Sequence, residues 1–165
     1  LFDKVECDNY NNINRLKLKQ AKVIIFSPGP GNPKNYPSTS EIYYQYKGKK
    51  KMIGICLGFQ QILFCEGAKI VEQNKIYHGY QSRVKVINKS SIFEKNKIFK
   101  VGRYHSLKLK EPFKINDFHI TMRCLESKVA MAFENKKDKI YGFQFHPESF
   151  LTNNGQLLIK KILSS

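Results

Sequence analysis

Two short apolar runs, each leading into a glycine-containing turn, constrain the fold of this chain more than any other feature. Residues 23–26 are continuously apolar and run into the Ser-Pro-Gly-Pro-Gly sequence of residues 27–31. Residues 51–56 form a second run, which is soon followed by Gly58. Short apolar runs without alternation are typical of strands covered on both faces, as in a parallel sheet. We therefore predict two buried strands, the first of which stops at a tight loop.

Each of these runs is followed by a helical pattern. Ser38 and Glu41 have the spacing of a capping box, which predicts a helix that continues to roughly Tyr46. Residues 57–66 are also predicted to be helical, with Ile62 and Leu63 on the apolar face. The resulting order of strand, helix, strand and helix is the signature of an open α/β sheet.

The rest of the chain has shorter, more alternating patterns. We predict an amphipathic helix at residues 155–163 and short strands at residues 82–87, 118–123, 129–133 and 140–145. A short strand at Val5 and Cys7 and a polar helix or loop at 13–19 are expected before the first apolar run. The predicted fold is α/β: an open mixed, mainly parallel sheet flanked by helices, with a small antiparallel extension. The length fits a single domain over residues 1–165.

The charge of the chain is its most unusual compositional feature. Lys and Arg number 29 against 13 Asp and Glu, and the formal net charge is +16. Such a charge is typical of proteins that bind nucleic acid or anionic membranes. Arginine, the preferred reader of phosphates and bases, supplies only four of the basic residues. We therefore interpret the charge as a lysine-rich surface and expect neither nucleic acid nor a membrane as a partner.

The cysteines and the chain start indicate the compartment. Cys7, Cys56, Cys65 and Cys124 form no CxxC pair, which argues against a zinc knuckle. No apolar run approaches the roughly 18 residues of a membrane span, and the first residues do not resemble a signal peptide. Reduced thiols and a cytoplasmic location are therefore expected.

One cysteine stands at the junction of the second apolar run and the following helix. Cys56 is flanked by Gly54 and Gly58, the spacing of a nucleophile elbow, in which a tight turn raises the nucleophile above the sheet. The dipole at the start of a helix favours the thiolate, and the backbone N–H of Leu57 can point at a developing oxyanion. A buried structural cysteine between two packing glycines explains the pentapeptide equally well.

A cysteine nucleophile needs a base, and the base needs a group that orients it. Among the four histidines, His146 ends an apolar strand, where the functional groups of α/β sheets gather. Pro147 favours extended backbone at His146, and side chains two residues apart in an extended chain project to the same side. Glu148 can therefore lie beside His146, which completes a Cys-His-Glu triad. His119 lies within an alternating strand and is interpreted as structural.

Several segments, all in family order, resemble the class I (triad-type) glutamine amidotransferases. Two are residues 54–60, Gly-Ile-Cys-Leu-Gly-Phe-Gln, and residues 145–149, Phe-His-Pro-Glu-Ser. Residues 27–33 are similar to the glycine loop of the chorismate-using branch, and residues 103–107, Arg-Tyr-His-Ser-Leu, to its glutamine-holding segment. Residues 150–155, which follow the last of these segments, also resemble the family pattern. The resemblance runs from about residue 23 to the C-terminus and favours the glutaminase component of anthranilate synthase or of aminodeoxychorismate (para-aminobenzoate) synthase.

The resemblance implies a mechanism in which Cys56 attacks the side-chain amide of L-glutamine. His146 accepts the thiol proton and later protonates the departing ammonia, and Glu148 orients His146. Water hydrolyses the glutamyl thioester to glutamate. The ammonia passes to a partner synthase that aminates chorismate, in tryptophan or folate biosynthesis. No cofactor is implied for this chain, and Mg²⁺ is expected only on the partner.

The resemblance also implies which residues hold the substrate. The oxyanion is expected at the N–H of Leu57 and at the loop formed by Gly29, Pro30 and Gly31. The backbone end of glutamine is expected to be bound by Gln60, Ser106 and Leu107, the last two mainly through their main chain.

Three features depart from the family pattern. Phe59 stands where the family usually has His, which affects packing beneath the elbow or the signal from the partner. Tyr80 follows His78-Gly79 where the branch usually has Lys, in a loop near the site. Family members also begin with a strand and a helix of about 25–30 residues before the segment that starts here. We expect the chain to lack this N-terminal strand–helix unit.

Three other kinds of function account for parts of the sequence less well. An amidotransferase serving a different synthetase, or another cysteine hydrolase, has the same fold, but the segments at 27–31 and 103–107 argue against both. A basic nucleic-acid-binding module would cluster lysines and aromatics on one face, and residues 49–51 are the only triple lysine run. An inactive relative kept for its interface is disfavoured by the intact triad residues.

Overall fold

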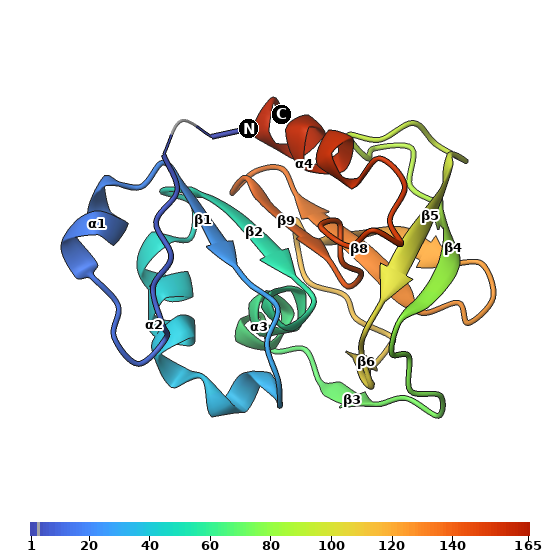
Figure 1. The fold of residues 1–165 in the computed structure, drawn as a ribbon, viewed down its shortest axis with the longest axis horizontal. Helices are drawn as coiled ribbons and strands as arrows, with labels where there is room; N and C mark the ends of the chain where they lie inside the picture. The colour runs from blue at the N-terminus through green and yellow to red at the C-terminus, as the bar shows by residue number, and fades with distance from the viewer. Residues whose placement is uncertain (3) are drawn as a thin grey trace.

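The computed structural model describes residues 1–2 and 4–165, and their strands form one mixed sheet and a separate strand pair (Figure 1). Seven strands lie in the order β1-β2-β9-β8-β7-β4-β5, and β3 pairs with β6. The strands are β1 (Val23–Phe26), β2 (Lys51–Ile55), β3 (Ile70–Glu72), β4 (Tyr80–Val86), β5 (Ile98–Arg103), β6 (Leu107–Leu109), β7 (His119–Cys124), β8 (Ala130–Asn135) and β9 (Ile140–Phe143).

The open mixed sheet confirms the expected fold class, although its balance differs from the expectation. β1 pairs with β2, and β2 with β9, in parallel. The other four pairings of this sheet, from β9 across to β5, are antiparallel. Antiparallel pairings therefore outnumber parallel ones, where a mainly parallel sheet with a small extension was expected. The physical reason is that short turns, such as those between β7, β8 and β9, can join only antiparallel neighbours.

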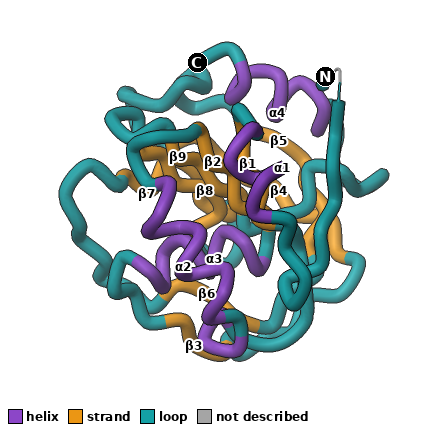
Figure 2. Tube along the Cα trace, turned by 90° about the vertical axis from the view of Figure 1, so that its left-hand side faces the viewer, coloured by secondary structure: helices purple, strands orange, loops and turns teal. Residues whose placement is uncertain are grey.

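Helices cover both faces of the sheet around its parallel strands. α2 (Pro37–Tyr46) and α3 (Leu57–Cys65) pack on one face, where Figure 2 shows them in front of the strands. α4 (Gly155–Leu163) packs on the other face. Met52 of β2 belongs to the core under α2 and α3, whereas Ile53 and Ile55 belong to the core under α4. Because each face of β2 is covered, its residues after Lys51 are all apolar. α1 (Arg15–Gln20) precedes β1, and the 3-10 helix η1 (Pro33–Asn35) lies between β1 and α2.

Two predictions of local structure were wrong. The residues around Val5 and Cys7 form no strand, and Val5 is 70% exposed, so an alternating pattern there meets no core. The capping box is also absent, because α2 begins at Pro37, before Ser38, and has no side-chain hydrogen bond at its cap. Proline suits the first helical position since its fixed φ is helical and it lacks the N–H that would stay unpaired there. Ser38 instead donates its hydroxyl to the carbonyl of Tyr10 at 3.0 Å.

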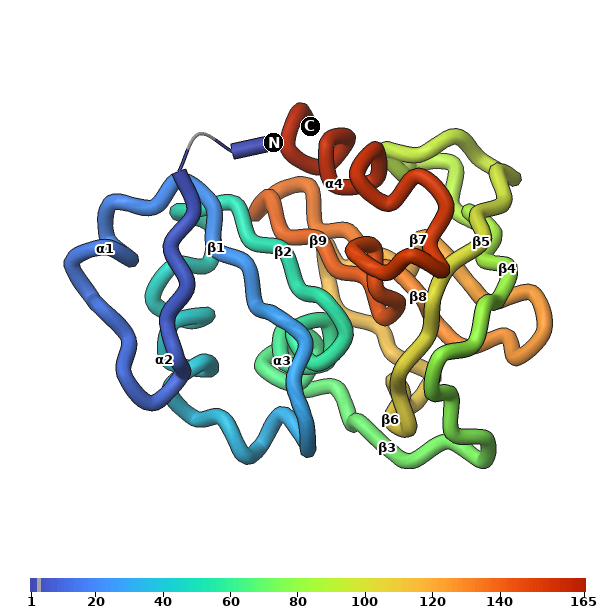
Figure 3. Tube along the Cα trace, in the orientation of Figure 1, coloured from blue at the N-terminus to red at the C-terminus, as the bar shows by residue number. Residues whose placement is uncertain are grey.

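The parallel strands bring the candidate site residues to one edge of the sheet. β1, β2 and β9 run in the same direction, so the glycine loop, the elbow cysteine and the segment that carries His146 follow neighbouring strand ends. The segment between β9 and α4 then passes beside β5 (Figure 3), where the His146 N–H donates to the Gly102 carbonyl at 3.0 Å. Asn153 N–H donates to the Lys100 carbonyl at 3.0 Å. Residues far apart in sequence are thereby held together.

Candidate active site

Cys56 joins β2 to α3 with a strained backbone. Its φ is 53° and its ψ is −101°, a positive φ that a non-glycine residue adopts at a cost and that a nucleophile elbow requires. A Cβ at Gly54 would lie 2.5 Å from the carbonyl oxygen of Gly58, and a Cβ at Gly58 would overlap the carbonyl of Phe26. The two glycines therefore let α3 pack directly on β1 and β2. Cys56 is only 6% exposed, so its thiol is largely shielded from solvent.

His146 and Glu148 lie side by side, as expected, but through a turn instead of extended backbone: Pro147 and Glu148 lie in a turn in which the Ser149 N–H donates to the His146 carbonyl at 3.2 Å. The Nδ1 of His146 is 2.6 Å from Oε1 of Glu148. The histidine side chain is 14% exposed, whereas the carboxylate side chain is 54% exposed. The other ring nitrogen, Nε2, is buried and makes no hydrogen bond to the described residues. Nε2 is therefore available to exchange a proton with a neighbouring thiol.

The pKa of His146 reflects its neighbours. Burial alone would lower this pKa, but interactions with Cys56 and then Glu148 outweigh burial and raise it to about 9. For Glu148, burial would raise the pKa, yet hydrogen bonding with His146 and with backbone N–H groups lowers it overall. The Cys56 thiol thus lies close enough to act on His146, although it does not meet the geometry of a hydrogen bond. The imidazole is therefore set to carry a proton at neutral pH.

Two buried glutamines extend the site. Gln60 donates Nε2 to Oε1 of Gln144 at 3.0 Å and to the carbonyl of Leu107 at 3.4 Å. Gln144 directs its own Nε2 towards the Cys56 sulfur, at 3.9 Å. Sequence reasoning had missed Gln144. The available signal was a polar residue in the otherwise apolar segment at 140–145, because buried amides are kept only where they find partners.

A buried hydrogen-bond chain fixes the backbone of Ser106 and Leu107. Arg103 is fully buried, stacks on Tyr77 with its guanidinium carbon 3.4 Å from the ring centroid, and donates Nε to Nε2 of His105 at 3.1 Å. Since Nε2 accepts, Nδ1 of His105 carries the proton and donates to the Leu107 carbonyl at 2.8 Å. Burial, and then the charge of Arg103, lower the pKa of His105 to about 4, so this histidine is neutral.

The predicted oxyanion loop lies beside the start of α3. A Cβ at Gly29 would lie 2.8 Å from Cδ2 of Leu57, which shows that this loop and the first residue of α3 are in direct contact. The hydroxyl of Tyr36 donates to the Pro30 carbonyl at 2.7 Å. Gly31 has φ +77°, which only glycine adopts without strain. The loop is thereby fixed against Leu57.

Tyr104 forms a wall of the site that the sequence did not single out. Its ring meets the His146 ring edge-on at a centroid distance of 5.0 Å, and its hydroxyl lies 3.1 Å from Oγ of Ser149. His78 meets the Tyr104 ring, also edge-on, at 6.0 Å. His119 lies elsewhere, at the start of β7 and opposite a residue of β8 in the ladder. Of the four histidines, His146 is thus the one placed next to the elbow.

Phe59 and Tyr80, the two residues that depart from the family pattern, have different surroundings. Phe59 is fully buried, and its ring lies 5.2 Å from that of Phe133, so it fills the core between α3 and the sheet. Tyr80 is 49% exposed and meets Tyr77 edge-on at 5.8 Å. Phe59 therefore contributes packing beneath the elbow, and Tyr80 contributes surface beside the site.

Within residues 1–2 and 4–165, no group of three or more His, Cys, Asp and Glu side chains could hold a metal ion. The described helices are all too short or too polar to cross a bilayer.

A thiol on a strained strand-to-helix turn lies next to an imidazole–carboxylate pair at the end of parallel strands, an arrangement typical of α/β proteins that use a cysteine nucleophile. The family model of class I glutamine amidotransferases matches residues 3–164. The chain belongs to the class I glutamine amidotransferase family.

Relatives with curated names support this membership. "Anthranilate synthase component 2" of Lactococcus lactis is 38% identical over 147 residues, which are 88% of this chain and 74% of that protein. The component 2 of Buchnera aphidicola subsp. Schizaphis graminum is 34% identical over 155 residues, or 92% of this chain and 76% of that protein. "Bifunctional protein TrpGD" of Thermotoga maritima is 34% identical over 154 residues, 92% of this chain but 26% of that longer protein.

Solved structures share the fold. A putative GMP synthase protein from Thermoplasma acidophilum has a TM-score of 0.78 at 22% identity, covering 93% of this chain and 77% of that one. A glutamine amidotransferase from Thermotoga maritima has a TM-score of 0.70 at 18% identity, covering 84% and 61%. These similarities establish the architecture around the elbow.

Proposed function

We propose that residues 1–165 form one glutamine amidotransferase domain that hydrolyses L-glutamine to glutamate and ammonia. The observation that carries the proposal is the arrangement of Cys56, His146 and Glu148. The cysteine stands on a strained turn, the buried Nε2 of His146 has no other partner among the described residues, and Glu148 holds Nδ1 at 2.6 Å.

The first half of the reaction follows from these positions. The thiol proton is the one that His146 carries at neutral pH, and the sulfur of Cys56 attacks the amide carbon of the glutamine side chain. The N–H of Leu57 and the adjacent loop at Gly29 and Gly31 stabilise the oxyanion. The carbon–nitrogen bond then breaks, and His146 returns its proton to the departing nitrogen, which leaves as ammonia. Glu148 stabilises the charged imidazole while it holds that proton.

The second half regenerates the enzyme. Water attacks the glutamyl thioester, His146 accepts the proton of the water, and the carbon–sulfur bond breaks. The sulfur takes back a proton and glutamate is released. Gln60 and the main chain of Ser106 and Leu107 bind the backbone end of the substrate, supported by the hydrogen bonds that fix these groups.

We assign the ammonia to a partner synthase that aminates chorismate, because the relatives named above are components of anthranilate synthase. Exposed apolar groups beside the site supply a surface for that partner. Phe150, two residues beyond Glu148, is 90% exposed, and Ile76 is 68% exposed near His78. Any Mg²⁺ belongs to the synthase, and the reduced Cys56 thiol fits a cytoplasmic setting.

The test is glutamate release from glutamine, measured for the chain alone and with an anthranilate synthase or an aminodeoxychorismate synthase partner. Turnover stimulated by a partner is expected, and Cys56→Ser should abolish it. Cys7→Ser and Cys65→Ser serve as controls that keep turnover, because both sulfurs lie outside the site. Full turnover in the Cys56 variant, or none with either partner, contradicts the proposal.

A further inference from the structure

A basic groove lies at the edge of the sheet opposite the candidate active site. Its volume is about 370 Å³, and six of its ten lining residues are lysine, whereas Lys and Arg together are 29 of the 165 residues of the chain. The groove is therefore far richer in positive charge than composition alone predicts. The lysines are Lys22, Lys49, Lys50, Lys51, Lys137 and Lys139.

The parallel strands explain why these lysines meet. Lys22 precedes β1, Lys51 begins β2 and Lys139 precedes β9, and these three strands are parallel neighbours. Val23 is in register with Lys51, and the Met52 N–H donates to the Lys139 carbonyl at 3.0 Å. Parallel strands start at a common edge, so lysines at equivalent positions converge there. The same strands end at the elbow, which places the groove at the far end of β2 from Cys56.

Some of the lysines are held in place by the protein. Lys51 donates its three ammonium N–H groups to the carbonyls of Ile162, Leu163 and Ser165, at 2.8, 2.9 and 2.7 Å, where α4 ends. Lys50 donates to the carbonyls of Lys19 and Ala21. These hydrogen bonds fix the charges without neutralising them.

Other lysines are free to bind a ligand. The ammonium groups of Lys22 and Lys139 make no hydrogen bond or ion pair with any described residue. Burial, and then the charge of Lys139, lower the pKa of Lys51, as expected where positive charge is uncompensated. The groove thus combines fixed charges with unpaired ones.

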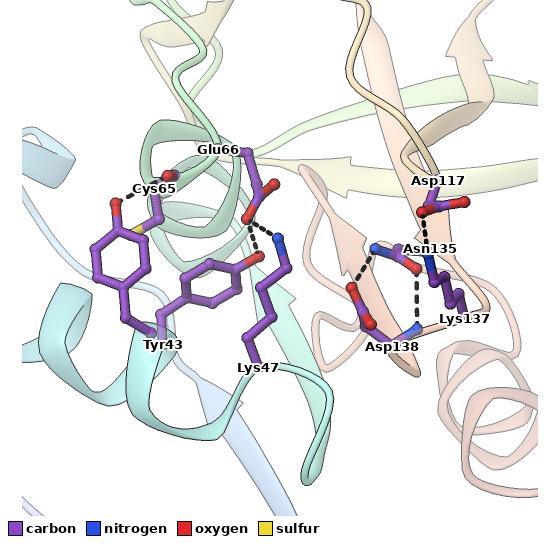
Figure 4. Close-up of polar contacts among 9 residues, drawn as sticks. Tyr43, Lys47, Cys65, Glu66, Asp117, Asn135, Lys137 and Asp138 are labelled. Carbon is purple, nitrogen blue, oxygen red and sulfur yellow. Dashed lines mark hydrogen bonds and ion pairs between the residues drawn. The ribbon is translucent and has the colours of Figure 1, made fainter.

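Little negative charge offsets these lysines. Among the described lining residues the one carboxylate is Asp138. It accepts a hydrogen bond from the Asn135 side chain at 3.0 Å (Figure 4). Lys137 is paired with Asp117 at 3.0 Å, on the same side of Figure 4. The remaining five lysines therefore dominate the field in the groove.

We propose that this groove binds a compact polyphosphate anion, of the size and charge of inorganic tripolyphosphate. Lysine is a point charge that suits phosphate oxygens, and several within one groove match several phosphates. The volume is that of a small-molecule site. The uncharged lining residues are Val23, Gly48 and Leu163, which offer no ring for a nucleobase to stack on. The groove therefore selects charge density over aromatic or apolar groups.

The test is calorimetric titration of the intact chain with tripolyphosphate at about 0.15 M salt, where long-range attraction is largely screened. Saturable 1:1 binding is expected. Lys22→Gln combined with Lys139→Gln should weaken it at least about tenfold, since each removes a charge-assisted hydrogen bond. Lys95→Gln combined with Lys114→Gln is the matched control, because it removes the same charge from exposed sites outside the groove. This control should change the affinity by less than about twofold.

Several outcomes overturn the proposal. Equal weakening in both double variants shows a response to net charge alone, and absence of saturation in the unmodified chain shows no site. Tighter binding of a glutamate-rich peptide or of an oligonucleotide shows a macromolecular surface instead.

A second measurement does not depend on the variants. Tripolyphosphate should protect Lys22 and Lys139 of the unmodified chain from an amine-reactive reagent, and leave Lys95 and Lys114 reactive. Equal protection of both sets contradicts a site in the groove.

Discussion

The side-chain amides of Gln60 and Gln144 share a buried hydrogen bond of 3.0 Å. Gln144 accepts this bond through Oε1, and its Nε2 faces the Cys56 sulfur at 3.9 Å. Gln60 also donates to the carbonyl of Leu107. One amide thus links the group proposed to attack glutamine with the group proposed to hold it. Substrate position and nucleophile position are therefore coupled through Gln144.

Replacing Gln144 tests this coupling. Gln144→Met keeps the volume but removes both hydrogen bonds of this amide, so Gln60 keeps only the Leu107 carbonyl as a partner. The KM for glutamine should rise about tenfold, the equivalent of one hydrogen bond, in steady-state glutaminase assays. Gln156→Met, at an exposed position of α4, is the control and should leave KM unchanged. A normal KM in the Gln144 variant would show that the amide only fills space.

The proton held by His146 predicts how activity depends on pH. With a pKa of about 9, His146 is protonated below that pH and loses the proton that ammonia needs above it. The value of kcat/KM should therefore fall as pH rises through about 9. Glu148→Gln removes a group that raises this pKa, so the fall should begin closer to neutral pH, and kcat should drop at least about tenfold. An unchanged alkaline limb in the variant would mean that Glu148 does not act through His146.

The elbow makes a prediction about stability. Gly58→Ala places a Cβ against the carbonyl of Phe26, and because both groups are backbone they cannot move aside. The variant should lose more than about 3 kcal/mol in unfolding free energy by urea titration. Gly67→Ala is the control: its φ of +83° costs about 1 kcal/mol, and no atom lies within 4 Å of the added carbon. Similar losses in the two variants would argue against close packing of α3 on β1.

The exposed side chain of Phe150 predicts where the partner synthase binds. The side chain of Phe150 is 90% exposed in the free chain, so covering it with a partner removes a large apolar surface from water and stabilises the complex. Phe150→Ser should weaken association with the synthase about tenfold or more, measured by titration of partner-stimulated turnover. Leu16→Ser removes another exposed apolar side chain, 76% exposed and distant in sequence, and should have little effect. Equal weakening by both would place the interface elsewhere.

The sequence predicted best where its pattern reflects one dominant interaction. β1 and α4 begin and end at the residues that their apolar patterns indicate. The pairing of His146 with Glu148 was also expected, although a turn at Pro147 and Glu148, and not extended backbone, brings the two side chains together. The strained turn at Cys56 matches the elbow expected from Gly54 and Gly58, whose missing side chains let α3 approach β1 and β2.

Features that depend on distant partners were not predictable. β5 was missed because only its last residues are buried, which leaves no alternation to detect. Gln144 is part of the site because it accepts a hydrogen bond from Gln60, eighty-four positions earlier in the chain. Tyr104 is part of the site because its ring contacts that of His146. The lysine groove exists because three strands start at one edge, whereas only residues 49–51 are adjacent in sequence. The prediction of a capping box was wrong because the Ser38 hydroxyl donates to the carbonyl of Tyr10 and does not cap the helix.

The identity of the nucleophile is the central claim, and covalent trapping tests it most directly. The protein, with its partner synthase present, is treated with an electrophilic analogue of glutamine and digested for peptide mass spectrometry. We expect one adduct per chain, on Cys56, together with loss of glutamate release, and protection when excess glutamine is present. Labelling at Cys7, Cys65 or Cys124 instead, or continued turnover after Cys56 is modified, would contradict the account.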